Sequence, residues 1–316
     1  MLVQRWIWRA PSRPERVRFT VFTPTFNRAH TLIRPYESLC AQQFRDFEWL
    51  IVDDGSSDGT RELVAGWIAA GQLTIRYLLQ ENGGKHRAFN HGVREARGEL
   101  FVPLDSDDWC TPDALARFDA HWSAIPPARR DAFSGIGCLC RDEAGKIVGE
   151  PFPASPLDAS LFALLRAKQL VGEKWGCHRT ALLKVEPFPE FPGEKFVPEA
   201  LVWNRLARGR LMRFVNEALR IYADSSDGLT ASLFRIRCAS PRGTRLYYRE
   251  AASLSLGARA RVMAWLNYGR FAAHAGLSPL ACWREGGGFA SALARVAGGA
   301  IAWRDRSAAR RRLRDD

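Results

Sequence analysis

Residues 100–109 read LFVPLDSDDW, a strand-like apolar run followed by three aspartates within four residues. The apolar run is typical of a buried strand, and the aspartates stand where that strand would end. Carboxylates packed this closely repel one another unless a positive charge lies between them. The stretch therefore predicts a strand end that holds a cation or a cationic ligand.

Two more polar clusters follow strand-like runs earlier in the chain. They are PTFN at residues 24–27, after VRFTVFT, and DDGSSDG at residues 53–59, after FEWLIV. Helix-like segments separate four strand-like runs, which are residues 17–23, 47–52, 73–79 and 99–104. This alternation predicts an α/β fold with a mostly parallel, Rossmann-like sheet flanked by helices. Ligands of such sheets bind beyond the carboxyl ends of the strands, where all three clusters fall.

Beyond about residue 130 the alternation gives way to other patterns. A hairpin is expected near residues 133–149, four prolines make residues 186–198 irregular, and residues 246–276 are mostly helical. The expected division is a basic N-terminal tail (1–16), a main domain (17–230, with halves 17–125 and 126–230) and a helical C-terminal extension with a basic tail (231–316).

The composition is that of a basic globular protein. The chain has 316 residues and a formal net charge of +12, with much of the excess in its two ends. Its seven cysteines show no metal-ligand spacing, so we expect free thiols in a reducing cytoplasm. No run of 18 apolar residues predicts a membrane span, and Arg5 and Arg9 interrupt the N-terminal apolar patch, which argues against a signal peptide.

The apolar segment GFASALARVAGGAIAW, residues 288–303, precedes the basic C-terminal tail. A helix here would lie on a membrane surface or dock on the protein itself, and the sequence favours neither. Basic ends are typical of solvated tails or of contact with an anionic membrane. We therefore expect a cytoplasmic protein, peripheral to the inner face of the membrane if the tail binds lipid.

The acidic cluster DDGSSDG is not an EF-hand calcium loop, because position 12 counted from Asp54 is Ala65 rather than glutamate. It is either a plain turn or a strand-end loop in which Asp54 accepts hydrogen bonds from a ligand. The segment ENGGKHRAFNHG, residues 81–92, contains a Gly-Gly turn followed by Lys85 and Arg87. No Walker frame fits it, but backbone and basic side chains together would grip an anion.

The cluster DSDD has a structural and a functional interpretation. Thr111 is the expected N-cap of the following helix, with Pro112 at its first position. Asp105 and Asp107 then have no capping role and would share a cation. Hard carboxylate oxygens that leave other positions for water and phosphate suit Mg²⁺ or Mn²⁺.

In order and spacing, these motifs resemble the nucleotide-sugar half of family-2 inverting glycosyltransferases with the GT-A fold. The matching segments are TPTFNRAHTL, WLIVDDGSSDGT and ENGGKHRAFNHGVREARGELFVPLDSDDW, within about residues 17–125. The resemblance implies that Pro24 and Phe26 line the pocket of the nucleotide base. It also implies that Asp54 forms a hydrogen bond to the base, with Asp53 beside it.

The same resemblance assigns roles to the acidic residues of LFVPLDSDDW. Asp105, Ser106 and Asp107 would form the DxD motif, with Asp105 near the ribose and Asp107 as the main metal ligand. Asp108 would be a further ligand or a helix cap. Lys85 or Arg87, the basic residues beside the Gly-Gly turn, would stabilise the diphosphate together with the metal ion.

Family-2 enzymes often carry their catalytic base in a motif like E-D-x-x-L-W, which PEALVW at residues 198–203 resembles. Glu199 stands in the place of the Asp, whereas Pro198 replaces the acidic residue before it. Proline and glutamate in a first helical turn also suit a plain helix start. Glu194 and Asp227 are alternative bases.

The resemblance implies a metal-dependent, hexosyltransferase-type enzyme that moves a sugar from a nucleoside-diphosphate sugar, UDP-linked, to an acceptor hydroxyl. Polysaccharide or glycoconjugate biosynthesis would supply a glycan or lipid-linked acceptor. The alternatives are a nucleotidyltransferase and a non-catalytic module that binds nucleotide sugars or glycans. Nucleic acid is not an expected partner, because it would not explain acidic strand ends.

Overall fold

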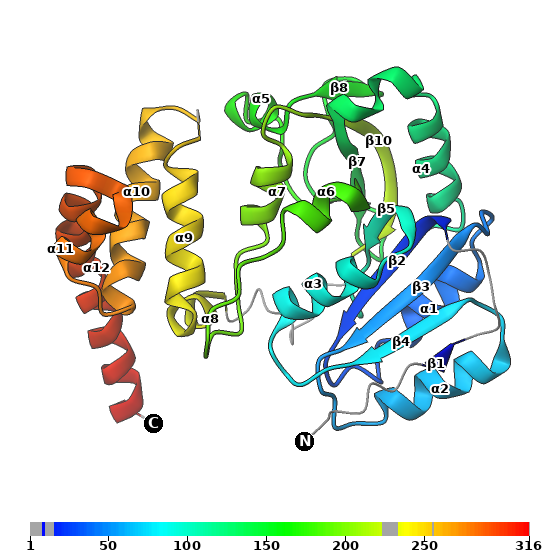
Figure 1. Cartoon of the computed structure of the whole chain (residues 1–316), viewed down its shortest axis with the longest axis horizontal. Coiled ribbons are helices and arrows are strands. Elements are labelled where there is room, and N and C mark those ends of the chain that lie inside the picture. The colour runs from blue at the N-terminus through cyan, green and yellow to red at the C-terminus, as the bar shows by residue number, and fades with distance from the viewer. Residues whose placement is uncertain (1–7, 10–15, 223–232, 255, 316) are drawn as a thin grey trace. The chain divides into compact units, whose positions relative to one another are not determined.

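The structure, a computed structural model, describes residues 8–9, 16–222, 233–254 and 256–315 (Figure 1). The chain divides into two compact units. The first comprises residues 1–187 and 204–226, and the second comprises residues 188–203 and 227–316. The proline-rich segment before residue 204 therefore groups with the C-terminal helices.

The first unit is built around a mixed sheet. Its strands are β1 (Trp8–Arg9), β2 (Val17–Thr25), β3 (Phe47–Asp53), β4 (Ile75–Leu79), β5 (Gly98–Pro103), β6 (Trp109–Cys110), β7 (Phe133–Arg141), β8 (Leu157–Ala159), β9 (Lys174–Arg179) and β10 (Leu211–Ile221). Their order is β1-β4-β3-β2-β5-β9-β7-β10-β6, with β8 paired to β10. The four expected strands form the parallel part, β4-β3-β2-β5.

Helices cover both faces of this parallel part, which explains why every residue of β3 is buried. The helices of the first unit are α1 (Ile33–Cys40), α2 (Thr60–Ala70), α3 (Lys85–Glu95), α4 (Ala114–Ser123), the 3-10 helix η1 (Pro127–Ala132), α5 (Leu161–Arg166) and α6 (Thr180–Val185). In the main core, Trp49 of β3 stacks with Tyr36 of α1 and Trp67 of α2. On the other face, Phe22 of β2 packs against Phe89 of α3.

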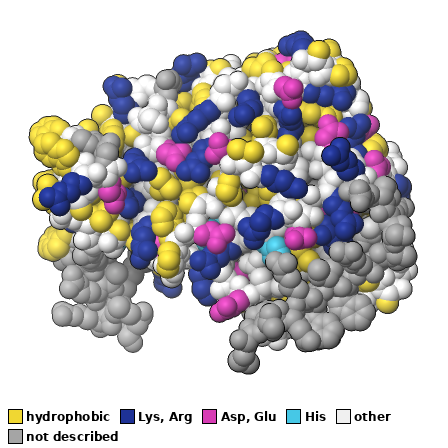
Figure 2. Space-filling model, in the orientation of Figure 1, with side chains coloured by type: hydrophobic (Ala, Val, Ile, Leu, Met, Phe, Trp, Pro, Cys, Tyr) yellow, Lys and Arg dark blue, Asp and Glu magenta, His cyan; other side chains and the backbone are white. Residues whose placement is uncertain are grey.

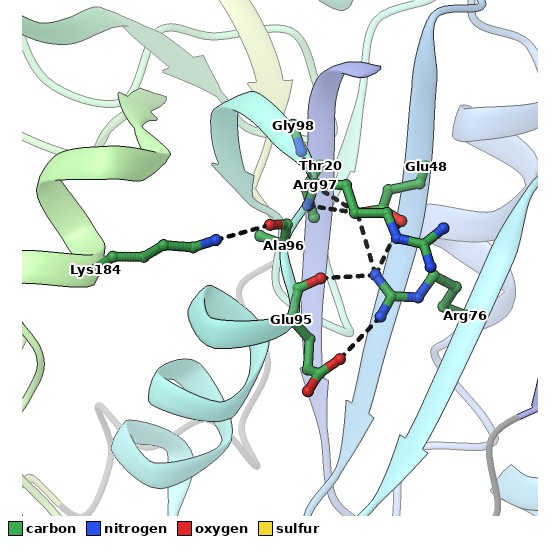
Figure 3. Close-up of polar contacts among 8 residues, drawn as sticks. All are labelled: Thr20, Glu48, Arg76, Glu95, Ala96, Arg97, Gly98 and Lys184. Atoms are coloured by element: carbon green, nitrogen blue, oxygen red, sulfur yellow. Dashed lines mark hydrogen bonds and ion pairs between the residues drawn. The ribbon is translucent and has the colours of Figure 1, made fainter. Parts of the chain in front are cut away.

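A buried polar network lies where α3 ends and β5 begins (Figure 3). Arg76 of β4 pairs with Glu48 of β3 at 3.1 Å, and both side chains are almost fully buried. The same guanidinium donates to the Glu95 carbonyl at 2.7 Å and to its carboxylate at 3.0 Å. Thr20 of β2 donates to Glu48 and accepts from the Gly98 N–H, both at 2.8 Å. These bonds fix the carboxyl end of α3 to the sheet.

In the part that the structure describes, the second unit is mostly helical, with residues 188–199 as an irregular segment. It contains most of α7 (Ala200–Leu206), together with α8 (Leu233–Ala239), α9 (Pro241–Ala251), α10 (Ala258–His274), α11 (Pro279–Cys282), the π-helix η3 (Trp283–Gly287) and α12 (Gly288–Asp315). Tyr268, Ala272, Cys282 and Ala294 form its buried core. Among the described helices, none combines the length and apolarity needed to cross a membrane.

One expected helix start is wrong. Helix α4 begins at Ala114 with Asp113 at its N-cap, and that cap has no side-chain hydrogen bond. The Thr111 hydroxyl is buried and makes no hydrogen bond to any described residue. The Thr111 N–H donates to the Leu219 carbonyl at 3.0 Å, next to the pairing of β6 with β10. Residue 111 therefore continues strand pairing instead of capping the helix.

Candidate functional site

The predicted site residues of the first unit gather at one edge of the sheet. The chain runs outward from β2 through β3 to β4 and then returns to β5 on the other side of β2. Strand order therefore reverses between β2 and β5, and open α/β sheets bind ligands beyond the strands at such a switch point. Strands β2, β3 and β5 end here at Thr25, Asp53 and Pro103, which lie within or beside the three polar clusters.

Asp54 holds the loop between β4 and α3 by its buried carboxylate. One oxygen accepts from the Gln80 side chain at 2.7 Å and from the Gly83 N–H at 2.8 Å. The other accepts from the Asn82 side chain at 3.3 Å and from the Gly84 N–H at 2.7 Å. Each oxygen thus has two donors, which fills its lone pairs. In this structure Asp54 shapes the Gly-Gly turn before α3, and a base would have to compete with these donors.

Asp53, the last residue of β3, is fully buried and turned toward the neighbouring strand. Its carboxylate accepts from the Tyr77 hydroxyl at 2.5 Å and from the Ser56 N–H at 2.7 Å. Burial, together with this hydrogen bond, raises the pKa of Tyr77 well above its ordinary value, so the phenol stays a donor. Asp53 therefore holds the start of the DDGSSDG loop against β4.

The loops after β2 and β3 are joined to each other. Asn27 receives a bond from Ser57 N–H at 2.8 Å and donates its own N–H to the Ser56 hydroxyl at 2.8 Å. Asn27 has φ 53°, a left-handed conformation that asparagine tolerates better than most residues. Pro24 is half-buried in β2, whereas the ring of Phe26 is 47% exposed. An exposed phenylalanine on this cross-linked loop suits the predicted base pocket.

Lys85, the first residue of α3, meets the acidic turn after β5. Its ammonium lies 2.8 Å and 3.0 Å from the two carboxylate oxygens of Asp105. Removal from water would raise the pKa of Asp105, but the charges of Lys85 and Arg220 lower it below its ordinary value. The Lys85 ammonium is therefore a cation beside the acidic strand end, where the sequence predicted a cation or a cationic ligand.

Asp108 faces the protein interior. Its carboxylate lies 3.4 Å from the guanidinium of Arg220 in β10, and both side chains are nearly buried. Arg220 also pairs with Glu173 at 3.2 Å. Ser106, in the same turn, is buried as well. Asp108 is thus part of a buried ion pair that holds the turn, and the N-cap position of α4 is Asp113 instead.

Asp107 lies between these two engaged carboxylates and is half-buried. Arg34 of α1 donates to its backbone carbonyl at 3.4 Å and lies over the ring of Trp109, 5.3 Å from its centre. Within the residues described, no three His, Cys, Asp or Glu side chains converge as metal ligands. The carboxylates of Asp105 and Asp107 are still the right donors for Mg²⁺ or Mn²⁺, which commonly use one or two carboxylates plus phosphate oxygens.

The three candidate bases belong to the second unit. Glu199 is exposed, and its carbonyl accepts from Val202 and Trp203 N–H groups at the start of α7. Glu194 is buried, and its two oxygens accept from the Arg242 and Gly243 N–H groups at 2.8 Å and 2.9 Å. Glu194 therefore caps α9, a role that its place in the sequence did not reveal. Asp227 lies outside the described residues.

Two residues at the site were not predicted. Arg220 and Arg34 support the acidic turn from elements more than 70 residues away, so no local motif points to them. The one available signal for Arg220 is a charged residue within the apolar strand pattern of ALRIY. Trp175 is buried in the core and packs against Phe118.

The acidic and basic groups therefore lie at the switch point of an open α/β sheet, the place where such sheets bind ligands. Residues 20–128 match the family model described as glycosyl transferase family 2. The chain is 28% identical over 211 residues to the GalNAc(5)-diNAcBac-PP-undecaprenol beta-1,3-glucosyltransferase of Campylobacter jejuni, covering 65% of this chain and 64% of that protein. The match to glycosyltransferase family 2 thus covers the part of the chain that carries the three polar clusters, about a third of its length.

Solved structures support the same fold. TarS 1–349 of Staphylococcus aureus, in complex with UDP-GlcNAc, has a TM-score of 0.58 at 22% identity and covers 85% of this chain and 76% of its own. The mannosyltransferase PcManGT of Pyrobaculum calidifontis, in complex with GDP-Man and Mn²⁺, has a TM-score of 0.54 at 20% identity and covers 91% of this chain and 81% of its own. The expected GT-A fold is confirmed.

Proposed function

We propose that this protein transfers a sugar, with inversion, from a nucleoside-diphosphate sugar to an acceptor hydroxyl in polysaccharide or glycoconjugate biosynthesis. The observation that carries the proposal is the pairing of Lys85 with the Asp105–Asp107 turn at the switch point of the sheet. A basic group and hard carboxylates at one edge suit a diphosphate bound with a divalent ion. UDP is the proposed nucleotide, as in the TarS complex.

We assign Asp107 and Asp105 as the residues that would hold Mg²⁺ or Mn²⁺. The Mn²⁺ in the PcManGT complex supports this cofactor class. A bound ion would supply Lewis-acid stabilisation of the departing diphosphate. Asp105 would bind it while remaining close to Lys85, whose ammonium lies within 3.0 Å in this structure.

The proposed acceptor is a hydroxyl of a lipid-linked glycan. The Campylobacter relative, whose name includes a PP-undecaprenol acceptor, supports this choice. A lipid-linked acceptor would bring the enzyme to a membrane surface, and the basic C-terminal tail would contribute to that contact. All seven cysteines are free thiols, in keeping with a cytoplasmic location at the inner face.

The reaction would be a single in-line displacement at the anomeric carbon. The acceptor oxygen forms its bond to that carbon as the bond to the diphosphate oxygen breaks, which inverts the configuration. Glu199 takes the proton of the acceptor hydroxyl. The diphosphate leaves with the bonding electrons, and Lys85 stabilises its growing negative charge.

Replacing Glu199 by glutamine tests the base. The amide cannot take a proton, so we expect transfer to fall by about 100-fold or more while donor affinity is unchanged. Sugar transfer and nucleotide-sugar binding, measured on the same preparation, separate the two effects. Glu190→Gln, an exposed glutamate on the preceding loop, is the matched control and should behave like the wild type. Transfer at a normal rate by the Glu199 variant would show that another residue is the base.

A further inference from the structure

Helix α12 has an unusual distribution of side-chain sizes. The residues that it buries are small, namely Ser291, Ala294, Gly298 and Ala302. Its large apolar residues Phe289, Leu293, Val296 and Trp303 are between 58% and 69% exposed, and Ile301 is half-buried. Buried positions of a packed helix normally hold the large apolar groups. The arrangement here is the reverse.

The buried row is small because α12 and α10 pack closely. A Cβ on Gly269 of α10 would lie 1.7 Å from the Ala294 carbonyl oxygen, and a Cβ on Gly298 would lie 2.2 Å from the Arg270 backbone nitrogen. Asp305 is also held on α10, by Arg270 at 2.5 Å and 2.6 Å and by His274 at 3.1 Å. One side of α12 is therefore docked on the protein itself.

The large residues form a second row on the opposite side. At 3.6 residues per turn, Phe289, Leu293, Val296 and Trp303 fall within a sector of about 80°, centred opposite the buried row. Trp283 of η3 extends this row, because its ring lies 6.5 Å from that of Phe289 and is 52% exposed. We call these five residues the α12 stripe; between its first and last helical residues it is about 21 Å long.

The chemistry beside the stripe indicates what covers it. Residues 304–316, which follow Trp303 directly, contain six arginines and three aspartates. Asp305 is engaged with α10, which takes one of these negative charges away from the solvent. Arg284, next to Trp283, is exposed. Figure 2 shows hydrophobic side chains exposed, with basic side chains beside them, at the margin where α11 and α12 lie in Figure 1.

We infer that the α12 stripe docks this protein on the surface of an anionic lipid bilayer. Tryptophan and phenylalanine in a row, flanked by arginines, are the residue types that insert at the headgroup boundary while basic groups bind anionic lipid. A second copy is the less suitable partner, because two arginine-rich ends would repel each other if the helices paired in parallel. The inference rests on the proposed function in one respect: a lipid-linked acceptor gives the enzyme a reason to be at the membrane.

Vesicle binding by the full-length protein tests this surface without donor or acceptor. The probe is vesicles of equal parts phosphatidylcholine and phosphatidylglycerol, with pure phosphatidylcholine as the uncharged comparison. We expect Val296→Ser combined with Leu293→Ser to lower the bound fraction at least about tenfold, because two inserted apolar side chains are lost. Raised salt should weaken wild-type binding without abolishing it.

Val185→Ser is the matched control, since Val185 is 76% exposed on α6, outside the stripe; it should bind vesicles like the wild type. Leu293→Ala with Val296→Ala keeps helix propensity and should also lose binding. The inference is overturned if the wild type does not bind anionic vesicles, or if the stripe variants bind them equally well. It is also overturned if light scattering shows a dimer that these variants dissociate while vesicle binding stays unchanged. Donor turnover in solution is measured separately, so failure here leaves the proposed reaction intact.

Discussion

Asp54 and Asp108 look alike in the sequence, since each stands in an acidic cluster after a strand, but the fold uses them differently. Asp54 accepts four hydrogen bonds from residues 80–84, two from backbone N–H groups and two from amide side chains. Asp108 pairs with Arg220, more than a hundred residues later. The sequence showed that carboxylates end these strands. It could not show which donors bind these carboxylates. Every residue except proline has a backbone N–H, so the sequence does not mark the ones that donate, and Arg220 is too distant along the chain to form a motif with Asp108.

Replacing Asp54 by asparagine should destabilise the loop before α3. One oxygen becomes an NH₂ group that faces N–H donors, so buried donors lose their acceptor, at a cost of about 2 kcal/mol. Urea unfolding measures the loss, and hydrogen exchange should speed up at Gly83 and Gly84. Glu81→Gln, the same change on an exposed residue of this loop, should alter neither. Unchanged exchange at both glycines would contradict the loop-holding role of Asp54.

Helix α3 is the element that connects the site to the body of the sheet. Asp54 holds the turn before Lys85, and the network of Arg76 and Glu48 holds Glu95 at the other end. Lys184 of α6 adds a bond to the Ala96 carbonyl at 3.1 Å (Figure 3). A helix fixed at both ends presents its first side chain in a defined position, which a diphosphate-binding lysine requires.

Arg76→Met should therefore cost both stability and donor binding. Removing one partner leaves Glu48 charged and buried, which typically costs 3–5 kcal/mol, or about 4 kcal/mol here. Urea unfolding and nucleotide-sugar titration measure the two effects, and adding Glu48→Gln should recover part of the stability. Arg94→Met, on the exposed side of α3, is the control and should change little. If Arg76→Met and Arg94→Met unfold at the same urea concentration, the network does not anchor the helix.

At the scale of elements, strands with a clear apolar run were predicted well. The runs at 17–23, 47–52, 73–79 and 99–104 correspond to β2, β3, β4 and β5. The start of α4 was predicted wrongly. Threonine is a suitable residue type for an N-cap, but the backbone N–H of Thr111 donates to the carbonyl of Leu219 in β10. Tertiary pairing overrode local propensity there, and β10 lies too far along the chain for a local pattern to reveal it.

At the scale of the whole molecule, the chain combines a sheet unit that carries the candidate donor site with a helical unit that carries Glu199 and α12. The expected boundary near residue 230 remains a prediction about domains. The proline-rich segment 188–203 groups with the helices because Glu194 caps α9 and Gly243 approaches the Phe196 carbonyl. The apolar segment 288–303 docks on α10 by one side, and membrane contact by its other side is our proposal.

The most direct test of the central claim is release of nucleoside diphosphate from a panel of nucleotide sugars, with Mg²⁺ or Mn²⁺ and an acceptor present. We expect the wild type to release UDP from one sugar donor and Asp107→Ala to release almost none, because that variant lacks the proposed ligand of the metal ion. Asp131→Ala, which removes an exposed aspartate in η1, should match the wild type. Release of no nucleotide by the wild type, or equal release by Asp107→Ala, would contradict the account.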